Sequence, residues 1–497
     1  MIKYVRQVYL YYFFAFLPFL VYTLVYFYLN NYFTELVHVQ TVYGSLQGLV
    51  QTSRDGRKFY QFNSIPYANH LRFQPPTPLE SWEGVKDATQ MTPNCLQYDL
   101  VFKSFRGQED CLFLNIYTPQ DPTKPTKKLL PVLVFIHGGI FMLGGSGELY
   151  SGRYFMDEDV IVVTVNYRLG ILGFLNTGDD VVSGNMGLKD QLEALKFVKR
   201  TIRDFGGDPN LITLWGESAG SVSVHLHMLS QQSKGLFQRA ISQSGSGFSP
   251  WAFQRNPREQ AVRLGNQFGC PTNNSEQLVE CLSSLDPWEL IQPQEKLLDI
   301  FIDPLDMFGP SVENVTSPEL KSTAFLTDYP YKLAAEGRTH PVPWISGVNS
   351  HEGCYRSAWL VGAPPLLKRL DTDWDNVASS AFLLFRNDSQ TFRKVRTSYF
   401  GEQNKEITIA DYEPLTNLIG DRFFSIPARD AALLHAKLSG APTYLYYFKE
   451  RVDDSIGHFL STLSDDSWMP RWLQLVTDVA RRRFYEFLDW EIQDFGK

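Results

Sequence analysis

The sequence lacks the features that mark several classes of protein. It has no excess of basic residues, since 46 Lys and Arg stand against 54 Asp and Glu and give a net charge of −8 at pH 7. It therefore offers no general basic surface for nucleic acid. It has no internal repeat and no low-complexity segment, and 44% of its 497 residues are hydrophobic. These properties exclude a disordered or collagen-like chain and predict a large packed core.

Cysteine is scarce, with five residues in the whole chain. So few cysteines exclude a disulfide-dense mini-scaffold, and no CxxC pair or Cys/His cluster indicates a zinc site. Four of the five form two sequence-local pairs and one is left over. In a cytosolic protein they would be scattered core thiols, whereas in an exported protein four would form two bridges. The residues are Cys95, Cys111, Cys270, Cys281 and Cys354.

Long hydrophobic runs are absent except at the N-terminus, where residues 8–29 form a stretch of 22 residues without a charge, preceded by Lys3 and Arg6. As a helix this stretch would span about 33 Å, which matches a bilayer. The positive flank predicts a type II signal anchor at residues 1–30, with the rest of the chain in the lumen or outside the cell. An atypical cleaved signal, which would make the protein secreted, and a mistaken start codon are the alternatives.

Asn-x-Ser/Thr glycosylation sequons give a second indication of export. They occur at Asn273, Asn314 and Asn387, all in polar stretches that are typical of surface loops. Because such triplets also arise by chance, they add only modest support to the exported alternative.

Beyond the N-terminus, short apolar runs alternate with helical patterns, which predicts an α/β fold for residues 36–497. Buried strands are predicted at Leu129–Gly139 and Val160–Gly170, followed by a helix at Gly187–Gly207 that stops at paired glycines. A third strand at Leu211–Gly220 leads at once into the helical stretch Ser221–Ser230. This order delivers the turn between strand and helix to the top of a parallel sheet.

That turn contains the sequence G-E-S-A-G at residues 216–220. A G-x-S-x-G between a strand and a helix is typical of a nucleophile elbow, in which the serine adopts a strained conformation and the glycines allow strand and helix to approach closely. We therefore predict that Ser218 is a nucleophile, with the N-terminus of the following helix behind it to stabilise negative charge. Upstream, the residues H-G-G-I-F (137–141) follow a predicted strand and form a loop of the kind that presents backbone N–H groups to an oxyanion.

Together these motifs resemble the type B carboxylesterase and cholinesterase-like branch of the α/β-hydrolases, over about residues 40–450. Further matches are the segments VYGSLQGLV, LRFQPPTPLESWEGVKDAT, EDCLFLN, NYRLGILGFL, DFGGDPNLITLWGESAG and ISQSGS. The resemblance implies a central, mostly parallel twisted sheet flanked by helices. It also implies disulfides Cys95–Cys111 and Cys270–Cys281, with Cys354 as a spare thiol.

The resemblance further implies a Ser-Glu-His triad. Ser218 is the nucleophile, Glu352 in SGVNSHEG is the acid, and His458 in DDSIGHFLSTL is the base. His435 is the other histidine downstream of the acid, and its place in a helical pattern favours a packed or solvated role. Glu217 matches the family's buried acid beside the nucleophile.

The oxyanion donors implied by the resemblance are the N–H groups of Gly139, Ile140 and Ala219. At position 140 the family most often has Gly or Ala, so the β-branched Ile140 predicts a crowded pocket that prefers small or slim acyl groups. Trp251 matches the residue that lines the family's acyl pocket. Its other interpretation is a plain core aromatic.

The predicted function is hydrolysis of carboxylic esters through an acyl-enzyme, without a cofactor or metal ion. Because the Cys95–Cys111 loop has no Trp for cation–π binding of choline, a general or arthropod-type carboxylesterase is favoured over an acetylcholine hydrolase. The alternatives are a catalytically impaired adhesion protein or pseudoenzyme of this family, and a lipase. The family usually carries a longer C-terminal region than the 39 residues that follow His458, so we expect a shortened C-terminus.

Overall fold

The computed structural model describes residues 35–99, 104–124, 128–147, 150–292, 308–384, 389–402 and 405–449. Three of the sequence-based predictions concern residues outside this part of the chain: the signal anchor at residues 1–30, the base His458 and the sequon at Asn387. Within the described residues, no helix combines the length and the apolar character needed to cross a membrane.

The centre of the molecule is an 11-stranded mixed sheet with the order β1-β2-β3-β9-β11-β10-β12-β13-β14-β15, and β6 pairs with β2. Two further pairs, β4 with β5 and β7 with β8, form small separate ribbons. The strands are β1 (Leu36–Gln40), β2 (Ser45–Thr52), β3 (Lys58–Pro66), β4 (Ala68–Asn69), β5 (Thr77–Pro78), β6 (Val85–Asp87), β7 (Gln97–Asp99), β8 (Ser104–Arg106), β9 (Phe113–Thr118), β10 (Leu130–Ile136), β11 (Ile161–Val165), β12 (Gly207–Glu217), β13 (Arg239–Gln243), β14 (Trp344–Asn349) and β15 (Thr443–Phe448).

The six strands from β11 to β15 in this order are all parallel to their neighbours, whereas β1, β2, β3 and β9 pair in antiparallel fashion. The predicted mostly parallel centre is therefore confirmed. Parallel strands are covered on both faces and read as continuous apolar runs. The sequence of β11, I-V-V-T-V, fits this rule because all of its residues are buried.

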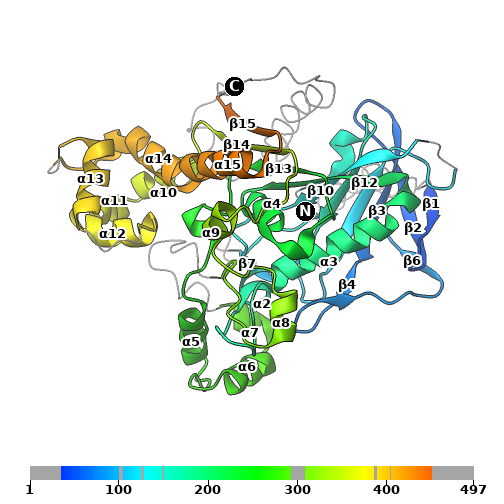
Figure 1. Cartoon of the computed structure of the whole chain (residues 1–497), viewed down its shortest axis with the longest axis horizontal. Helices are drawn as coiled ribbons and strands as arrows, with labels where there is room; N and C mark the ends of the chain where they lie inside the picture. Colours follow the sequence, from blue (N-terminus) through cyan, green and yellow to red (C-terminus); the bar gives the residue numbers. More distant parts are fainter. Residues whose placement is uncertain are drawn as a thin grey trace, which may run out of the picture.

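Helices connect the parallel strands and cover the sheet, and Figure 1 shows α3 and α4 lying across its near face. The α-helices are α2 (Gly170–Phe174), α3 (Met186–Thr201), α4 (Ala219–Leu229), α5 (Pro257–Gln267), α6 (Ser275–Ser284), α7 (Pro287–Ile291), α8 (Pro318–Thr323), α9 (Pro330–Ala335), α10 (Cys354–Gly362), α11 (Pro364–Thr372), α12 (Trp374–Ala381), α13 (Ser389–Phe400), α14 (Tyr412–Gly420) and α15 (Ile426–Ser439). Between α14 and α15 the helix continues as a π-helical turn, η7 (Asp421–Ser425).

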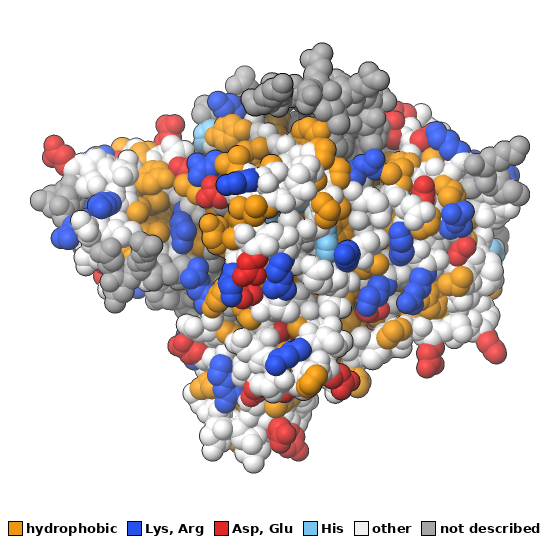
Figure 2. All heavy atoms as spheres, viewed as in Figure 1, with side chains coloured by type: hydrophobic (Ala, Val, Ile, Leu, Met, Phe, Trp, Pro, Cys, Tyr) orange, Lys and Arg blue, Asp and Glu red, His pale blue; other side chains and the backbone are white. Residues whose placement is uncertain are grey.

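Two groups of helices project from the sheet. Helices α10 to α14 pack against one another as a lobe on the left of Figure 1, and α5 to α8 form a second lobe below. Helix α15 instead packs on β14 and β15. On the face drawn in Figure 2, Lys and Arg side chains are interspersed with Asp, Glu and hydrophobic side chains. This face therefore presents both signs of charge.

The structure differs from the prediction at the strand–helix junction. The third predicted strand was extended to Gly220, but β12 ends at Glu217 and α4 begins at Ala219. The connection is thus a single residue, Ser218. Its N–H donates to the carbonyl of Gln243 at the end of β13, and its carbonyl already accepts from Val222 in the helix. Both sides of the turn are thereby fixed.

Candidate active site

Ser218 lies in a backbone conformation that few residues adopt, with φ 56° and ψ −118°. Such a conformation carries strain, and it persists only where the surroundings enforce it. The flanking glycines make it possible: a Cβ on Gly220 would lie 1.9 Å from the carbonyl oxygen of Ile136, and a Cβ on Gly216 would lie 2.3 Å from the backbone of Gly220. The predicted strain of the elbow is therefore present, and both glycines are needed for the close approach of strand and helix.

The H-G-G-I-F loop lies directly against this turn. Strand β10 ends at Ile136, which pairs with Gly216 of β12, so the loop leaves the sheet beside the elbow. A Cβ on Gly138 would lie 2.9 Å from the Cβ of Ser218 and 2.6 Å from the Oε2 of Glu217. Side chains are excluded there, and backbone groups face the serine.

The next two residues of the loop have left-handed backbones, with φ 114° for Gly139 and φ 51° for Ile140. For a β-branched residue such as Ile140 this conformation is a genuine outlier. Within the described part of the chain, the N–H groups of Gly139 and Ile140 donate to no other residue. Ala219 opens α4, so its N–H also has no partner inside the helix. Three backbone donors are thus available beside Ser218.

Glu352 follows β14 at the same edge of the sheet, because β12, β13 and β14 are parallel neighbours. Its Oε1 accepts a hydrogen bond of 2.6 Å from the Oγ of Ser244 and one of 2.7 Å from the N–H of Asn349. Burial raises the pKa of the Glu352 carboxyl, and these hydrogen bonds oppose the rise. The carboxylate is therefore desolvated and at the same time held in a fixed orientation, as a triad acid must be.

Glu217, beside Ser218, is a half-buried carboxyl. Its pKa is raised to about 7, first by burial and second by the charge of Glu352. An acid next to Ser218 thus exchanges its proton close to neutral pH, and perturbed pKa values of this kind cluster at functional sites.

Trp251 is buried beside the elbow, on the short 3₁₀ turn Pro250–Ala252. A Cβ on Gly245 would lie 3.5 Å from the Cη2 of Trp251 and 3.0 Å from the carbonyl oxygen of Ser218. Gly245 therefore lies between the indole ring and the backbone of Ser218. Its Nε1 donates to the carbonyl of Phe423 at 3.1 Å.

Disulfides Cys95–Cys111 and Cys270–Cys281 are both present, as the resemblance implied, and Cys354 is a free thiol.

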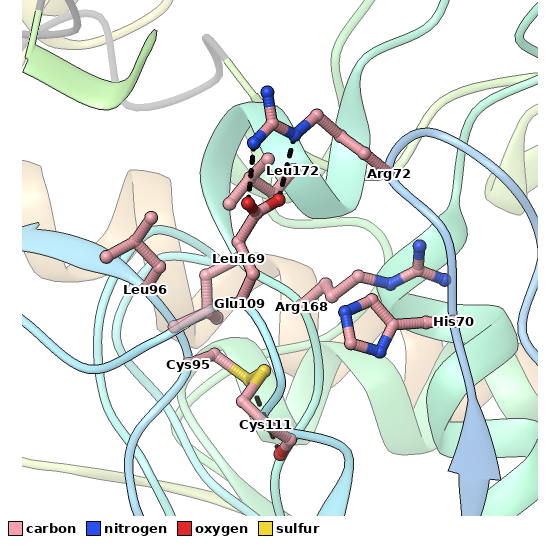
Figure 3. Close-up of a pocket in the computed structure, with 9 residues that line it drawn as sticks. All are labelled: His70, Arg72, Cys95, Leu96, Glu109, Cys111, Arg168, Leu169 and Leu172. Atoms are coloured by element: carbon pink, nitrogen blue, oxygen red, sulfur yellow. Dashed lines mark hydrogen bonds and ion pairs between the residues drawn. A yellow bond between two sulfur atoms is a disulfide. The ribbon is translucent and has the colours of Figure 1, made fainter. Parts of the chain in front are cut away.

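Figure 3 shows a small cavity beside the Cys95–Cys111 bridge, where the Arg72 guanidinium binds both carboxylate oxygens of Glu109. Its volume of about 10 Å³ admits about one water molecule. Ser218, Glu352 and the glycine loop do not line it. We therefore regard it as a structural ion-pair site.

The remaining predicted residues fall in different places. Asn273 and Asn314 are exposed, as glycosylation requires. His435 is buried on α15, where its Nε2 contacts the carbonyl of Val342 at 3.0 Å. It is therefore packed in the core, in agreement with the prediction.

The sequence analysis did not single out Ser244, although the matched segment ISQSGS contains it. The Ser-Gly pair at the end of a predicted strand could have indicated Ser244, because such pairs mark turns. Ser244 has a left-handed backbone, with φ 61°.

Comparison with known proteins agrees with this geometry. Residues 35–469 match the model of the carboxylesterase family. A carboxylic ester hydrolase of Bombus ignitus is 41% identical over 443 residues, which cover 85% of this chain and 76% of the relative. Venom carboxylesterase-6 of Apis mellifera is 38% identical over 442 residues, or 86% of this chain and 77% of the relative.

A solved structure of similar fold is the juvenile hormone esterase of Manduca sexta with OTFP covalently attached. It superposes with a TM-score of 0.75 at 31% identity and covers 86% of this chain and 80% of that one. The predicted α/β-hydrolase fold is thereby confirmed. The two bridges and the venom relative are consistent with a protein of the secretory pathway.

The family match spans most of the chain, and the relatives of known name are esterases. The prediction of an ester hydrolase is confirmed, and the adhesion alternative is not favoured. The chain belongs to the carboxylesterase family, the enzymes that hydrolyse carboxylic esters.

Proposed function

We propose that Ser218, Glu352 and His458 form the catalytic triad of this esterase. The observation that carries the proposal is the strained backbone of Ser218, at φ 56° and ψ −118°, with a glycine loop against it. In this mechanism the Oγ of Ser218 attacks the ester carbonyl while His458 takes its proton. His458 then returns the proton to the departing alcohol, and water releases the acid from the acyl-enzyme by the same steps.

The strand that precedes His458 in the chain, β15, ends close to Glu352. Phe448, the last residue of β15, pairs with Asn349, and its carbonyl accepts from the N–H of Ser350. The strand therefore ends within a few residues of Glu352. Nine residues lie between Phe448 and His458, enough for a loop that returns to the acid. We propose that the Glu352 carboxylate receives the Nδ1–H of His458 and stabilises the imidazolium.

The oxyanion of the tetrahedral intermediate is assigned to the N–H groups of Gly139, Ile140 and Ala219. Their freedom from other partners and their position beside Ser218 support this assignment. Loss of one such donor typically raises the barrier by about 3 kcal/mol. The solved juvenile hormone esterase carries OTFP covalently attached. A covalent adduct is what an activated serine forms, so we expect Ser218 to form one too.

The acyl group of the substrate is placed against Ile140 and Trp251. Ile140 is a half-buried residue of the glycine loop. We propose that its branched side chain reduces the space beside Ser218. We therefore propose esters with small or slim acyl groups as substrates.

We further propose that residues 8–29 anchor the enzyme in a membrane of the secretory pathway, with glycans on Asn273, Asn314 and Asn387.

Labelling of the expressed chain with a fluorophosphonate probe tests the triad. The wild type is expected to label, and Ser218→Ala and His458→Ala are each expected to lose labelling while staying folded by circular dichroism. A folded wild type that does not react would overturn the proposal. Labelling that survives in His458→Ala would overturn only the choice of base.

A further inference from the structure

The main chain next to the proposed triad acid lies directly against another helix. Glu352 is followed by Gly353, the N-cap residue of α10, and Figure 1 shows α10 beside α14. A Cβ on Gly353 would overlap the carbonyl oxygen of Thr416 and would lie 2.9 Å from the amide nitrogen of Gly420. Thr416 and Gly420 of α14 therefore form a seat for the main chain that follows the acid.

This seat belongs to one stripe of α14. Tyr412, Thr416 and Gly420 are spaced four residues apart, so they lie on the same face of the helix. Two of them make polar contacts with the first turn of α10. The hydroxyl of Tyr412 lies 2.8 Å from the Sγ of Cys354, and the Oγ1 of Thr416 lies 2.6 Å from the Oγ of Ser357. The stripe thus touches the segment of the acid at three successive turns.

Thr416 is the central residue of the stripe, and both Thr416 and Ser357 are buried. The hydroxyl of Thr416 donates to the carbonyl of Tyr412 at 2.8 Å, so its Oγ1 accepts the hydroxyl hydrogen of Ser357. A buried hydrogen bond between two helices favours one relative position, because a shift would leave a polar group without a partner and away from water. The pair therefore fixes the position of α10 along α14, and with it the position of Gly353.

The side chain of Glu352 is held at its other end as well. Its carboxylate accepts hydrogen bonds from the Oγ of Ser244 and from the N–H of Asn349. The seat on α14 holds the main chain. Because a displacement of about 1 Å in a catalytic group can reduce the rate about a hundredfold, the orientation of the acid depends on both ends.

We propose that Thr416 is a positioning residue for the triad acid. Its hydrogen bond to Ser357 holds α10 on α14, this contact fixes Gly353, and Gly353 carries the main chain of Glu352. The inference rests on the proposed triad and deepens it. It names a residue of the helical lobe α10 to α14 on which the orientation of the acid depends.

The test compares the hydrolysis of p-nitrophenyl acetate by the full-length wild type, Thr416→Val and Thr416→Ser. Valine keeps the shape of threonine but cannot bond to Ser357, whereas serine keeps the hydroxyl. Active sites are counted by titration to completion with a fluorophosphonate, so that kcat refers to folded enzyme. We expect kcat to fall about fivefold or more in Thr416→Val while KM stays within about twofold, because the acid shifts and no substrate contact changes. Thr416→Ser should restore kcat to within about twofold of the wild type.

Thr201→Val is the matched control. Thr201 is also buried in a helix, and its Oγ1 donates to the carbonyl four residues earlier, that of Phe197, at 2.9 Å. This variant loses the same kind of hydrogen bond on α3, outside the helical lobe, and should keep the wild-type kcat. An equal fall in kcat in Thr201→Val or in Thr416→Ser would assign the effect to general packing and overturn the inference.

Ser357→Ala removes the same hydrogen bond from the side of α10, and it keeps the test decisive if Thr416→Val does not fold. We expect a fall in kcat of similar size, and no further fall when the two changes are combined, because both break one bond. Unchanged kcat in folded variants at these two positions would overturn the inference alone. A folded wild type that neither hydrolyses the ester nor labels with fluorophosphonate would overturn the proposed triad, and this inference with it.

Discussion

The Oγ of Ser244 donates a 2.6 Å hydrogen bond to the Oε1 of Glu352. Ser244 directly follows β13 and Glu352 follows β14, so the bond joins the segments at the carboxyl ends of two neighbouring parallel strands. Ser244 also has a left-handed backbone, with φ 61°. The acid of the proposed triad is thus oriented by a strained serine that is 108 residues away in sequence.

Removal of this bond should weaken catalysis more than folding. In Ser244→Ala the carboxylate of Glu352 loses a charge-assisted partner, which is worth about 1.5–3 kcal/mol, so kcat/KM should fall about tenfold or more. The pKa of Glu352 should also rise, because the lost bond favours the charged form. The acid limb of the pH–rate profile should then move to higher pH.

Ser346→Ala is the control for this change. Ser346 is buried on β14, and its Oγ has no hydrogen-bond partner among the described residues. Its removal should leave both kcat/KM and the pH profile unchanged. Equal losses in the two variants would mean that Ser244 acts only on stability.

Replacement of Ile140 by glycine should improve both stability and the turnover of bulky esters. Its φ of 51° costs an L-residue about 1–2 kcal/mol relative to glycine, and the missing side chain opens the space above Ser218. Ile140→Ala opens the same space but keeps a Cβ in the left-handed region. Hydrolysis of bulky esters should therefore rise in both variants, whereas the melting temperature should rise more in Ile140→Gly. Unchanged rates would contradict the crowding assigned to Ile140.

Glu217 should make stability fall as the pH rises. Glu217 has a folded-state pKa of about 7, above the ordinary value of 4.5, so between these pH values the folded chain keeps a proton that the unfolded chain releases. Ionisation of the Glu217 carboxyl therefore destabilises the folded wild type. Glu217→Gln cannot ionise at this position and keeps its stability. The variant should gain up to about 3 kcal/mol over the wild type at pH 8 and little at pH 4.5.

Chemical denaturation at the two pH values measures this difference. Glu259→Gln, at an exposed position, should show no such dependence. A gain of equal size at both pH values would indicate a packing effect and not the titration of Glu217.

The buried histidines of α4 should make the protein sensitive to acid. The pKa of His225 is lowered from 6.5 to about 3, first by burial and second by His435. The Nδ1 of His225 accepts the N–H of Gly247 at 3.0 Å. Protonation of this Nδ1 would turn the acceptor into a donor and break the hydrogen bond. Because the unfolded chain takes up the proton first, stability is lost as the pH falls below 6.5, by about 2–3 kcal/mol at pH 4.5.

His225→Asn should reduce this slope between pH 7 and pH 4.5, as measured by denaturation, even if it lowers stability at pH 7. His38→Asn, on the exposed face of β1, should keep the wild-type slope. Identical slopes in all three proteins would assign the acid sensitivity to other groups.

The sequence by itself determined the family and the order of the strands around the elbow, and it predicted Ser218 as the nucleophile. These are local properties: an apolar run predicts a buried strand, and G-x-S-x-G at its end leaves one residue for the turn. Glycine is required at positions 138, 216 and 220, because a Cβ at each would lie within 3 Å of neighbouring backbone atoms. The pairing of the cysteines was implied by the family resemblance, and both bridges are present.

Only the tertiary structure decided which distant residues support the site. Ser244 comes to Glu352 because β13 and β14 are neighbours in the sheet, a pairing that no local pattern encodes. The pKa of Glu217 depends on burial and on the charge of Glu352, which lies 135 residues away in sequence. The Nε1–H of Trp251 donates to the carbonyl of Phe423, which is 172 residues away in sequence. Such contacts arise from packing, in which the whole fold fixes each partner.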